Sequence, residues 1–70
     1  HPDLALRGAA EKGHIFVLNA FSEYLNEENY NNVIEAFRTG GIITNNKEEM
    51  SRIGTFIQDA QLRDLFIAKI

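Results

Sequence analysis

Two histidines and several acidic side chains are the residues of this sequence that could support a reaction or hold a metal ion. His14 follows Gly13 at the start of an apolar run, and the other histidine is His1. A metal or catalytic site needs several convergent groups, and the sequence has no cysteine and no carboxylate cluster close to His14. We therefore interpret Gly13 and His14 as a structural turn, and we expect no catalytic residue, no metal site and no cofactor.

Adjacent glutamates occur twice, in "NEEN" and "KEEM", and paired carboxylates could serve acid–base chemistry or bind calcium. Neither run has the spaced oxygen ligands of an EF-hand loop. Both lie at predicted helix starts, where carboxylates interact favourably with the helix dipole, so helix capping is the preferred interpretation. Gly40 and Gly41 could form a phosphate-binding loop, but no lysine and hydroxyl residue follow them. Gly40 is therefore interpreted as a structural turn that ends a helix.

The elements that position these residues are predicted to be helices. Apolar residues recur mostly at three and four positions, which favours an all-α fold of about five short helices without a sheet. The first helix is expected to follow Asp3 as its cap and to end at a left-handed Gly13. A second, with a broad apolar face, is expected over about residues 14–25. A third begins near Tyr30 and ends before Gly40.

Two more helices are predicted near the carboxyl end. Asn46 and Glu49 have the spacing of a capping box, and Asp59 is placed to cap the last helix. That helix carries the apolar residues Leu62, Leu65, Phe66 and Ile70, which we expect to pack in the core rather than on a membrane or a partner helix. The predicted core residues are Leu6, Leu18, Phe21, Ile34 and Phe37, with Phe16 also favoured as buried.

Composition excludes several classes of protein. The net charge of −3 and the seven scattered basic residues argue against a nucleic-acid partner, which would require clustered lysine and arginine. No apolar run approaches the roughly 20 residues that cross a bilayer, so we expect no membrane partner. Without cysteine there is no disulfide, and no signal peptide is recognisable, so a soluble, intracellular protein is expected.

One stretch has a family resemblance. In "LRGAAEKGHIFVL" an Ala-Ala pair near a helix end precedes a Gly-His turn and a second apolar helix. Small side chains at Ala9 and Ala10 allow two helices to approach closely, and Gly13 then reverses the chain. This order, over about residues 4–25, resembles the ankyrin repeat. A weaker echo follows, in which Val33, Ala36, Gly40 and Ile42 repeat Leu6, Ala9, Gly13 and Ile15 at one constant spacing.

The resemblance implies that residues 1–70 form a single ankyrin-like segment of stacked helix pairs, the terminal part of a larger protein. It implies a non-catalytic module for protein–protein interaction or scaffolding, of the kind found in bacterial effectors. Polar residues at the ends of the inner helices are then the contact candidates: Arg7, Glu11, Lys12 and Arg38. Exposed repeat ends would favour self-association.

Two alternatives remain open at this point. The first is a compact bundle of five helices that regulates or caps an enzyme located elsewhere in the parent chain. The second is a small helical nucleic-acid reader, which the acidic composition disfavours. A stacked order of helix pairs would distinguish the ankyrin-like segment from the bundle.

Overall fold

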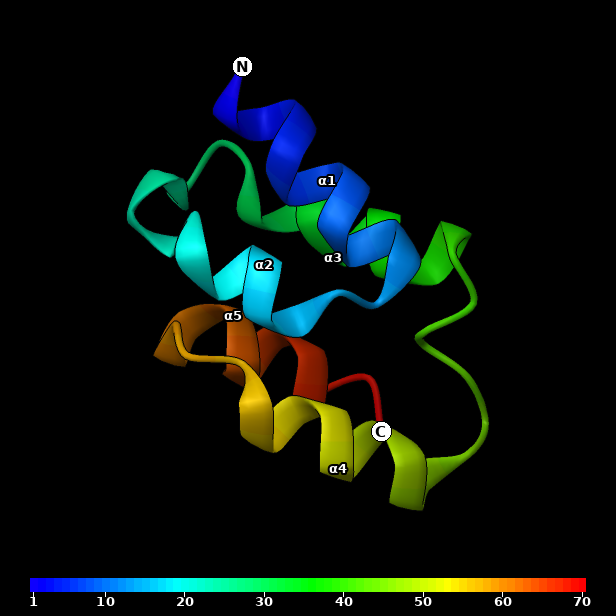
Figure 1. Ribbon diagram of the computed structural model, residues 1–70. Coiled ribbons are helices and arrows are strands. Elements are labelled where there is room, and N and C mark those ends of the chain that lie inside the picture. The colour runs from blue at the N-terminus through cyan, green and yellow to red at the C-terminus, as the bar shows by residue number, and fades with distance from the viewer.

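The computed structural model describes all 70 residues as helices joined by short turns, without a strand (Figure 1). The order of elements is α1 (Pro2–Lys12), α2 (Ile15–Ala20), the 3-10 turn η1 (Ser22–Tyr24), α3 (Tyr30–Thr39), α4 (Lys47–Phe56) and α5 (Ala60–Ile67). The predicted all-α class and the five α-helices are confirmed.

The start of α1 differs from the prediction. The helix begins at Pro2, whose missing N–H suits the first helical position. His1 occupies the cap, and its Nδ1 accepts a hydrogen bond from the backbone N–H of Asp3 at 3.2 Å. The prediction of Asp3 as the cap was therefore wrong. The Asp3 carboxylate lies in the first turn and accepts a bond from Asn29 Nδ2 at 2.9 Å.

The end of α1 follows the prediction. Gly13 has a φ of 70°, in the left-handed region that glycine adopts without strain. The N–H of His14 donates to the carbonyl of Ala9 at 2.9 Å, which closes a Schellman turn. A Cβ atom at Gly13 would also lie 2.8 Å from the Ile42 side chain. Both the backbone conformation and the available space thus favour glycine at this position.

The end of α3 has the same Schellman turn as the end of α1. Its left-handed glycine lies one residue later than the alignment of Gly40 with Gly13 predicts. The N–H of Ile42 donates to the carbonyl of Phe37 at 2.8 Å, and the left-handed residue is Gly41, with a φ of 77°. Gly40 has a right-handed φ of −80°, so it does not correspond to Gly13. It is required for another reason, because a Cβ atom there would overlap the backbone carbonyl of Glu11.

The second helix is shorter than predicted. It ends at Ala20 and continues as η1, whereas a helix to Leu25 was expected. His14 stands at its amino-terminal cap but its side chain makes no capping hydrogen bond. Asn29 Nδ2 donates to the carbonyl of Tyr24 at 2.8 Å. After Ala20 the N–H groups of Phe21 and Tyr24 donate to the carbonyls three residues earlier, Leu18 and Phe21, so the chain tightens into a 3-10 turn, and Asn29 then pairs with the carbonyl at the end of η1.

Asn29 is the one buried polar residue, with 3% of its surface exposed. Its Oδ1 accepts from the N–H of Asn26 at 2.8 Å, and its Nδ2 donates both to Asp3 Oδ1 and to the carbonyl of Tyr24. Every hydrogen of the amide group therefore has a partner, as a buried polar group requires. The side chain joins the turn before α3 to the start of α1.

The caps of α4 and α5 are confirmed. Asn46 Oδ1 accepts from the N–H of Glu49 at 3.0 Å, and Asp59 Oδ1 accepts from the N–H of Leu62 at 2.9 Å. The helix α5 ends at Ile67, however, so the predicted extension to Ile70 was wrong.

The two pairs of glutamates differ in position. Glu48 and Glu49 lie in the first turn of α4, as predicted. Glu27 and Glu28 precede α3, whose first turn contains no acidic residue, so the prediction that this pair caps a helix was wrong.

The core lies where all five helices meet. Its buried residues are Leu6, Ala9, Ala10, Leu18, Tyr30, Val33, Ile34, Ala36, Phe37, Met50, Ile57, Leu62 and Phe66. The rings of Phe37 and Phe66 meet edge to face with centroids 5.0 Å apart. Of the predicted core residues, Phe21 and Leu65 stay partly exposed, and the prediction that Ile70 packs in the core was wrong, because 40% of its surface is exposed. The prediction that Phe16 is buried was wrong, because 75% of its surface is exposed.

The helices pack in an order that departs from their order in the chain. The helix α1 packs against α3 and α2, while α4 packs against α5 and α2. The helix α3 contacts α5 rather than its neighbour in sequence, α4. Gly54 permits the close approach of α4 and α5, since a Cβ atom there would collide with the Ile67 side chain. In Figure 1, α1 and α3 form the upper part of the molecule and α4 and α5 the lower part, with α2 between them.

Tyr30 joins the start of α3 to the start of α5. Its hydroxyl lies 3.1 Å from each carboxylate oxygen of Asp59. Burial raises the pKa of Tyr30 above its ordinary value of 10.0, and the hydrogen bond to Asp59 and the negative charges of Asp59 and Glu27 act in the same direction. The folded protein therefore retains this proton at a pH where the unfolded chain has lost it.

This difference predicts a specific loss of stability in alkaline solution. Since the folded state binds more protons above pH 10, the free energy of unfolding falls as the pH rises from about 10, and below that pH Tyr30 has no such effect. Tyr30→Phe should lower the free energy of unfolding by about 1 kcal/mol at neutral pH. Because phenylalanine has no proton to release, the variant should not show the fall in stability that Tyr30 causes above about pH 10. Urea unfolding of both proteins between pH 8 and about 11 tests this. Parallel losses in the two proteins would contradict it.

Candidate binding groove

An open groove runs between α2 and α4 and has a volume of about 660 Å³. We call it the α2–α4 groove. It is lined by Lys12, Gly13, His14, Ile15, Phe16, Val17, Ile42, Glu49, Arg52, Ile53 and Phe56. We call its half-buried apolar residues, Ile15, Ile42 and Ile53, the base, and its exposed charged residues, Lys12, Glu49 and Arg52, the rim. An apolar lining with a few polar groups is usual for a site that binds a ligand.

Two phenylalanines face solvent at this groove. Phe16 of α2 and Phe56 of α4 meet edge to face with ring centroids 5.9 Å apart. Their exposed fractions are 75% and 47%, and the adjacent Val17 is 48% exposed. Clustered exposure of large apolar side chains marks interaction sites more often than isolated exposure does.

The walls of the groove are held together by one side chain. Asn19, on α2, donates from Nδ2 to the carbonyl of Phe56 at 2.8 Å and accepts at Oδ1 from the N–H of Gln58 at 2.9 Å. Its amide group thus pairs with the backbone at the end of α4 much as a neighbouring strand would. The separation of α2 from α4 is set by this contact and by the two phenylalanine rings.

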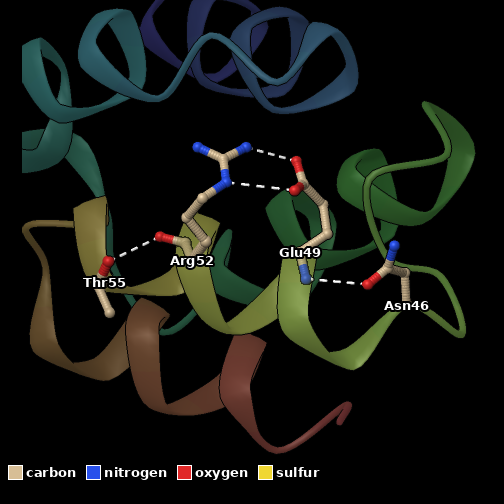
Figure 2. A network of polar contacts seen from close by, with 4 residues as sticks. All are labelled: Asn46, Glu49, Arg52 and Thr55. Atoms are coloured by element: carbon tan, nitrogen blue, oxygen red, sulfur yellow. Dashed lines mark hydrogen bonds and ion pairs between the residues drawn. The ribbon is translucent and has the colours of Figure 1, made fainter.

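The charged rim on α4 consists of Glu49 and Arg52, one turn apart (Figure 2). Arg52 Nε donates to one carboxylate oxygen of Glu49 at 3.2 Å, and Arg52 Nη2 donates to the other. Figure 2 shows this pair on the side of α4 that faces α1 and α2, with the remaining guanidinium nitrogen directed away from Glu49. That nitrogen, Nη1, has no hydrogen-bond partner in the chain.

The pairing determines the charge of this rim. The hydrogen bond from Arg52 lowers the pKa of Glu49, and that from Glu49 raises the pKa of Arg52. Both groups are therefore ionised at neutral pH, and together they are neutral. Lys12 is exposed and forms no ion pair. Lys12 is thus the one lysine, arginine or carboxylate of the groove outside this ion pair, on a chain whose net charge is −3.

The four predicted contact residues lie on two different surfaces. Arg7 and Glu11 border a second, polar depression of about 270 Å³ between α1 and α3, with Asn32, Glu35, Ala36 and Thr39. Arg38 is exposed beside it and pairs with Glu35 at 3.5 Å. Lys12 instead borders the α2–α4 groove. The predicted turn residues Gly13 and His14 also line this groove, whereas Gly40 does not.

The structure contains no group of three or more histidine, cysteine, aspartate or glutamate side chains arranged to hold a metal ion. None of its helices combines the length and the apolar character needed to cross a membrane.

The prediction from sequence missed the residues that dominate the groove. Phe56, three residues after Ile53, stands at the margin of the apolar stripe of Met50, Ile53 and Ile57, and this marginal position is the signal that could have indicated its partial exposure. The opposite charges of Glu49 and Arg52, three residues apart, could likewise have indicated an ion pair.

Comparison of this chain with models of protein families, with curated proteins and with solved structures finds no match. No relative therefore supplies a fold family or an activity. The resemblance to ankyrin repeats stays a prediction, and function has to be inferred from the α2–α4 groove and its side chains.

Proposed function

We propose that this chain is a non-catalytic protein-binding module and that a segment of another protein binds in the α2–α4 groove. The observation that supports this proposal most strongly is the exposed pair of Phe16 and Phe56 at the mouth of an apolar groove. Burial of one phenylalanine stabilises a protein by roughly 1.5–3 kcal/mol. Phe16 and Phe56 both stay exposed in part, so the folded chain lacks some of this stabilisation at two positions. A partner that covers the two rings would supply it on binding.

The aromatic pair also has the properties of binding hot spots. Hot spots are enriched in large, rigid side chains near the centre of an interface, surrounded by residues that exclude water. Phe16 and Phe56 line the groove together with the apolar residues of the base and the charged residues of the rim. We therefore assign the main binding energy to these two rings and a positioning role to the rim.

An ankyrin-like repeat is part of the same proposal. Two features support it, the repeated helix and left-handed glycine at Gly13 and Gly41, and the packing of α1 on α3 and of α2 on α4. The second pair departs from this arrangement, because α3 packs against α5 and not against α4. In a stack of helix pairs, α1 and α3 would be the inner helices and α2 and α4 the outer ones. Arg7, Glu11 and Arg38 would then form a second, polar contact surface on the inner helices.

Selection from a peptide library tests the proposal. A displayed library of random peptides of about 15 residues would be selected on the wild-type chain, and the enriched peptides would then be measured on Phe16→Ala and Phe56→Ala. We expect enriched peptides with aromatic or aliphatic anchors, and at least tenfold weaker binding to either variant, since a hot spot contributes about 2 kcal/mol or more.

Leu4→Ala is the matched control, because Leu4 is also an exposed apolar residue, at 65%, but it does not line the groove. Its affinity for the same peptides should equal that of the wild type. Peptides that bind all four proteins equally, or a library without any enriched peptide, would refute binding in the α2–α4 groove. A loss confined to charge reversals at Arg7 and Arg38 would assign binding to the inner-helix surface instead.

The second candidate function is a regulatory or capping bundle attached to an enzyme in the parent chain. The observation that favours it is the position of α5, which packs against both α3 and α4 and closes them around one core. Sedimentation equilibrium separates the two candidates. An open stack should self-associate through its end helices, whereas a closed bundle should remain monomeric.

A further inference from the structure

The α2–α4 groove has a cationic rim, and this rim restricts the partner. We propose that the segment bound there carries an acidic side chain next to its apolar anchor. This inference rests on the proposed function, because it specifies the chemistry of the partner at the same groove. It is drawn from the charged groups of the rim and from the hydrogen bonds that they already make.

The first observation is that the acidic group of the rim is occupied. Both carboxylate oxygens of Glu49 accept hydrogen bonds from Arg52. A basic partner would meet only the remaining lone pairs of a carboxylate whose charge Arg52 already compensates. Glu49 is therefore a poor site for a lysine or arginine of the partner.

The second observation is that the two cationic groups retain free donors. Lys12 has no ion pair, and Arg52 Nη1 has no partner in the chain. The bond to Glu49 fixes the plane of the guanidinium group, so a carboxylate that approaches Nη1 meets an oriented donor (Figure 2). The chain's overall charge of −3 would repel an acidic segment elsewhere, which makes this rim the favourable place for it.

The third observation is the arrangement of apolar and charged residues. Lys12 is the last residue of α1, Arg52 lies on α4, and Ile15, Ile42 and Ile53 line the same groove. An apolar side chain on this base would place neighbouring residues of the same segment close to the cationic groups. A carboxylate on one of these residues gains an ion pair, whereas an ammonium group is repelled.

The enriched peptides of the library selection give the first test. We expect an excess of aspartate and glutamate over lysine and arginine within a few residues of the anchor. The tightest peptide would then be synthesised with its acidic residue and with the corresponding amide. The amide form should bind the wild type about threefold more weakly, as expected for a single exposed ion pair.

Two variants locate the effect. Lys12→Gln should abolish the part of the affinity difference between the acidic peptide and its amide form that depends on Lys12. The charge-neutral double variant Glu49→Gln/Arg52→Gln should abolish the part that depends on Arg52. Lys47→Gln is the matched control, since Lys47 is exposed but does not line the groove. Added salt should weaken binding of the acidic peptide and leave the amide form nearly unchanged.

Failure of this inference is distinct from failure of the proposed function. Peptides that need Phe16 but bind equally as acid and amide would overturn the acidic partner and leave the binding groove intact. An acid preference that stays undiminished in both the Lys12 variant and the double variant would also overturn it. The absence of any Phe16-dependent peptide would refute the proposed function, and this inference with it.

Discussion

Gly40→Ala should lower the free energy of unfolding by more than about 3 kcal/mol, which would unfold much of a domain of this size. The added Cβ atom would overlap the carbonyl oxygen of Glu11 at the end of α1. The obstacle is backbone, so it cannot rotate away as a flexible side chain could. The helices α1 and α3 would have to separate, and their buried residues would lose contact.

The other glycines supply the matched controls. Gly41→Ala introduces strain at a φ of 77° but meets open space, so a cost of about 1 kcal/mol is expected. Gly8→Ala meets nothing within 4 Å and lies inside α1, where alanine should stabilise the helix by up to about 1 kcal/mol. Urea unfolding followed by circular dichroism measures all three variants. A Gly40→Ala protein as stable as Gly41→Ala would contradict the close approach of α1 and α3.

Asn29→Asp should cost about 3 kcal/mol although the two side chains have the same shape. The amide nitrogen of Asn29 donates to the Asp3 carboxylate and to the carbonyl of Tyr24. An oxygen in its place would be a buried negative group facing two acceptors, and removal of a donor from such a network leaves each of them without its partner. The start of α1 and the end of η1 should lose their order first.

Asn26→Asp is the control for this prediction. Asn26 is exposed, and its Oδ1 accepts from the N–H groups of Glu28 and Asn29, a role that a carboxylate also fulfils. The change removes only a long bond, from Asn26 Nδ2 to the carbonyl of Tyr24 at 3.5 Å. Its stability should stay within about 0.5 kcal/mol of the wild type. Thermal unfolding of both variants at neutral pH gives the comparison. Equal losses at the two positions would attribute the effect to the added charge alone.

The helices were predictable from sequence wherever their signals are local. The caps by Asn46 and Asp59 act over three residues, and the left-handed Gly13 directly follows the helix that it ends. The end of α2 was not predictable, because the chain tightens there into the 3-10 turn η1, whose last carbonyl is bound by Asn29 from the turn before α3. The need for glycine at position 40 likewise depends on distant backbone, that of Glu11.

The α2–α4 groove was less predictable than the helices that form it. An amphipathic pattern indicates that a helix has a broad apolar face, but the packing of other helices decides which part of that face is covered. Phe16 follows Ile15 in an apolar run and was expected inside, yet α4 meets α2 only along one side. The contact of Phe16 with Phe56 joins residues of two helices that no local spacing connects.

The contact of Asn19 with the end of α4 has a consequence for the speed of binding. Two hydrogen bonds hold the walls of the groove at a fixed separation before any partner arrives. A peptide therefore encounters a preformed site, and only side chains such as Phe16 have to rotate. Because rotation of exposed side chains takes nanoseconds or less, association should be limited by diffusion and orientation rather than by a slow conformational step. Differences in affinity between partners will then arise mainly from how long each complex lasts.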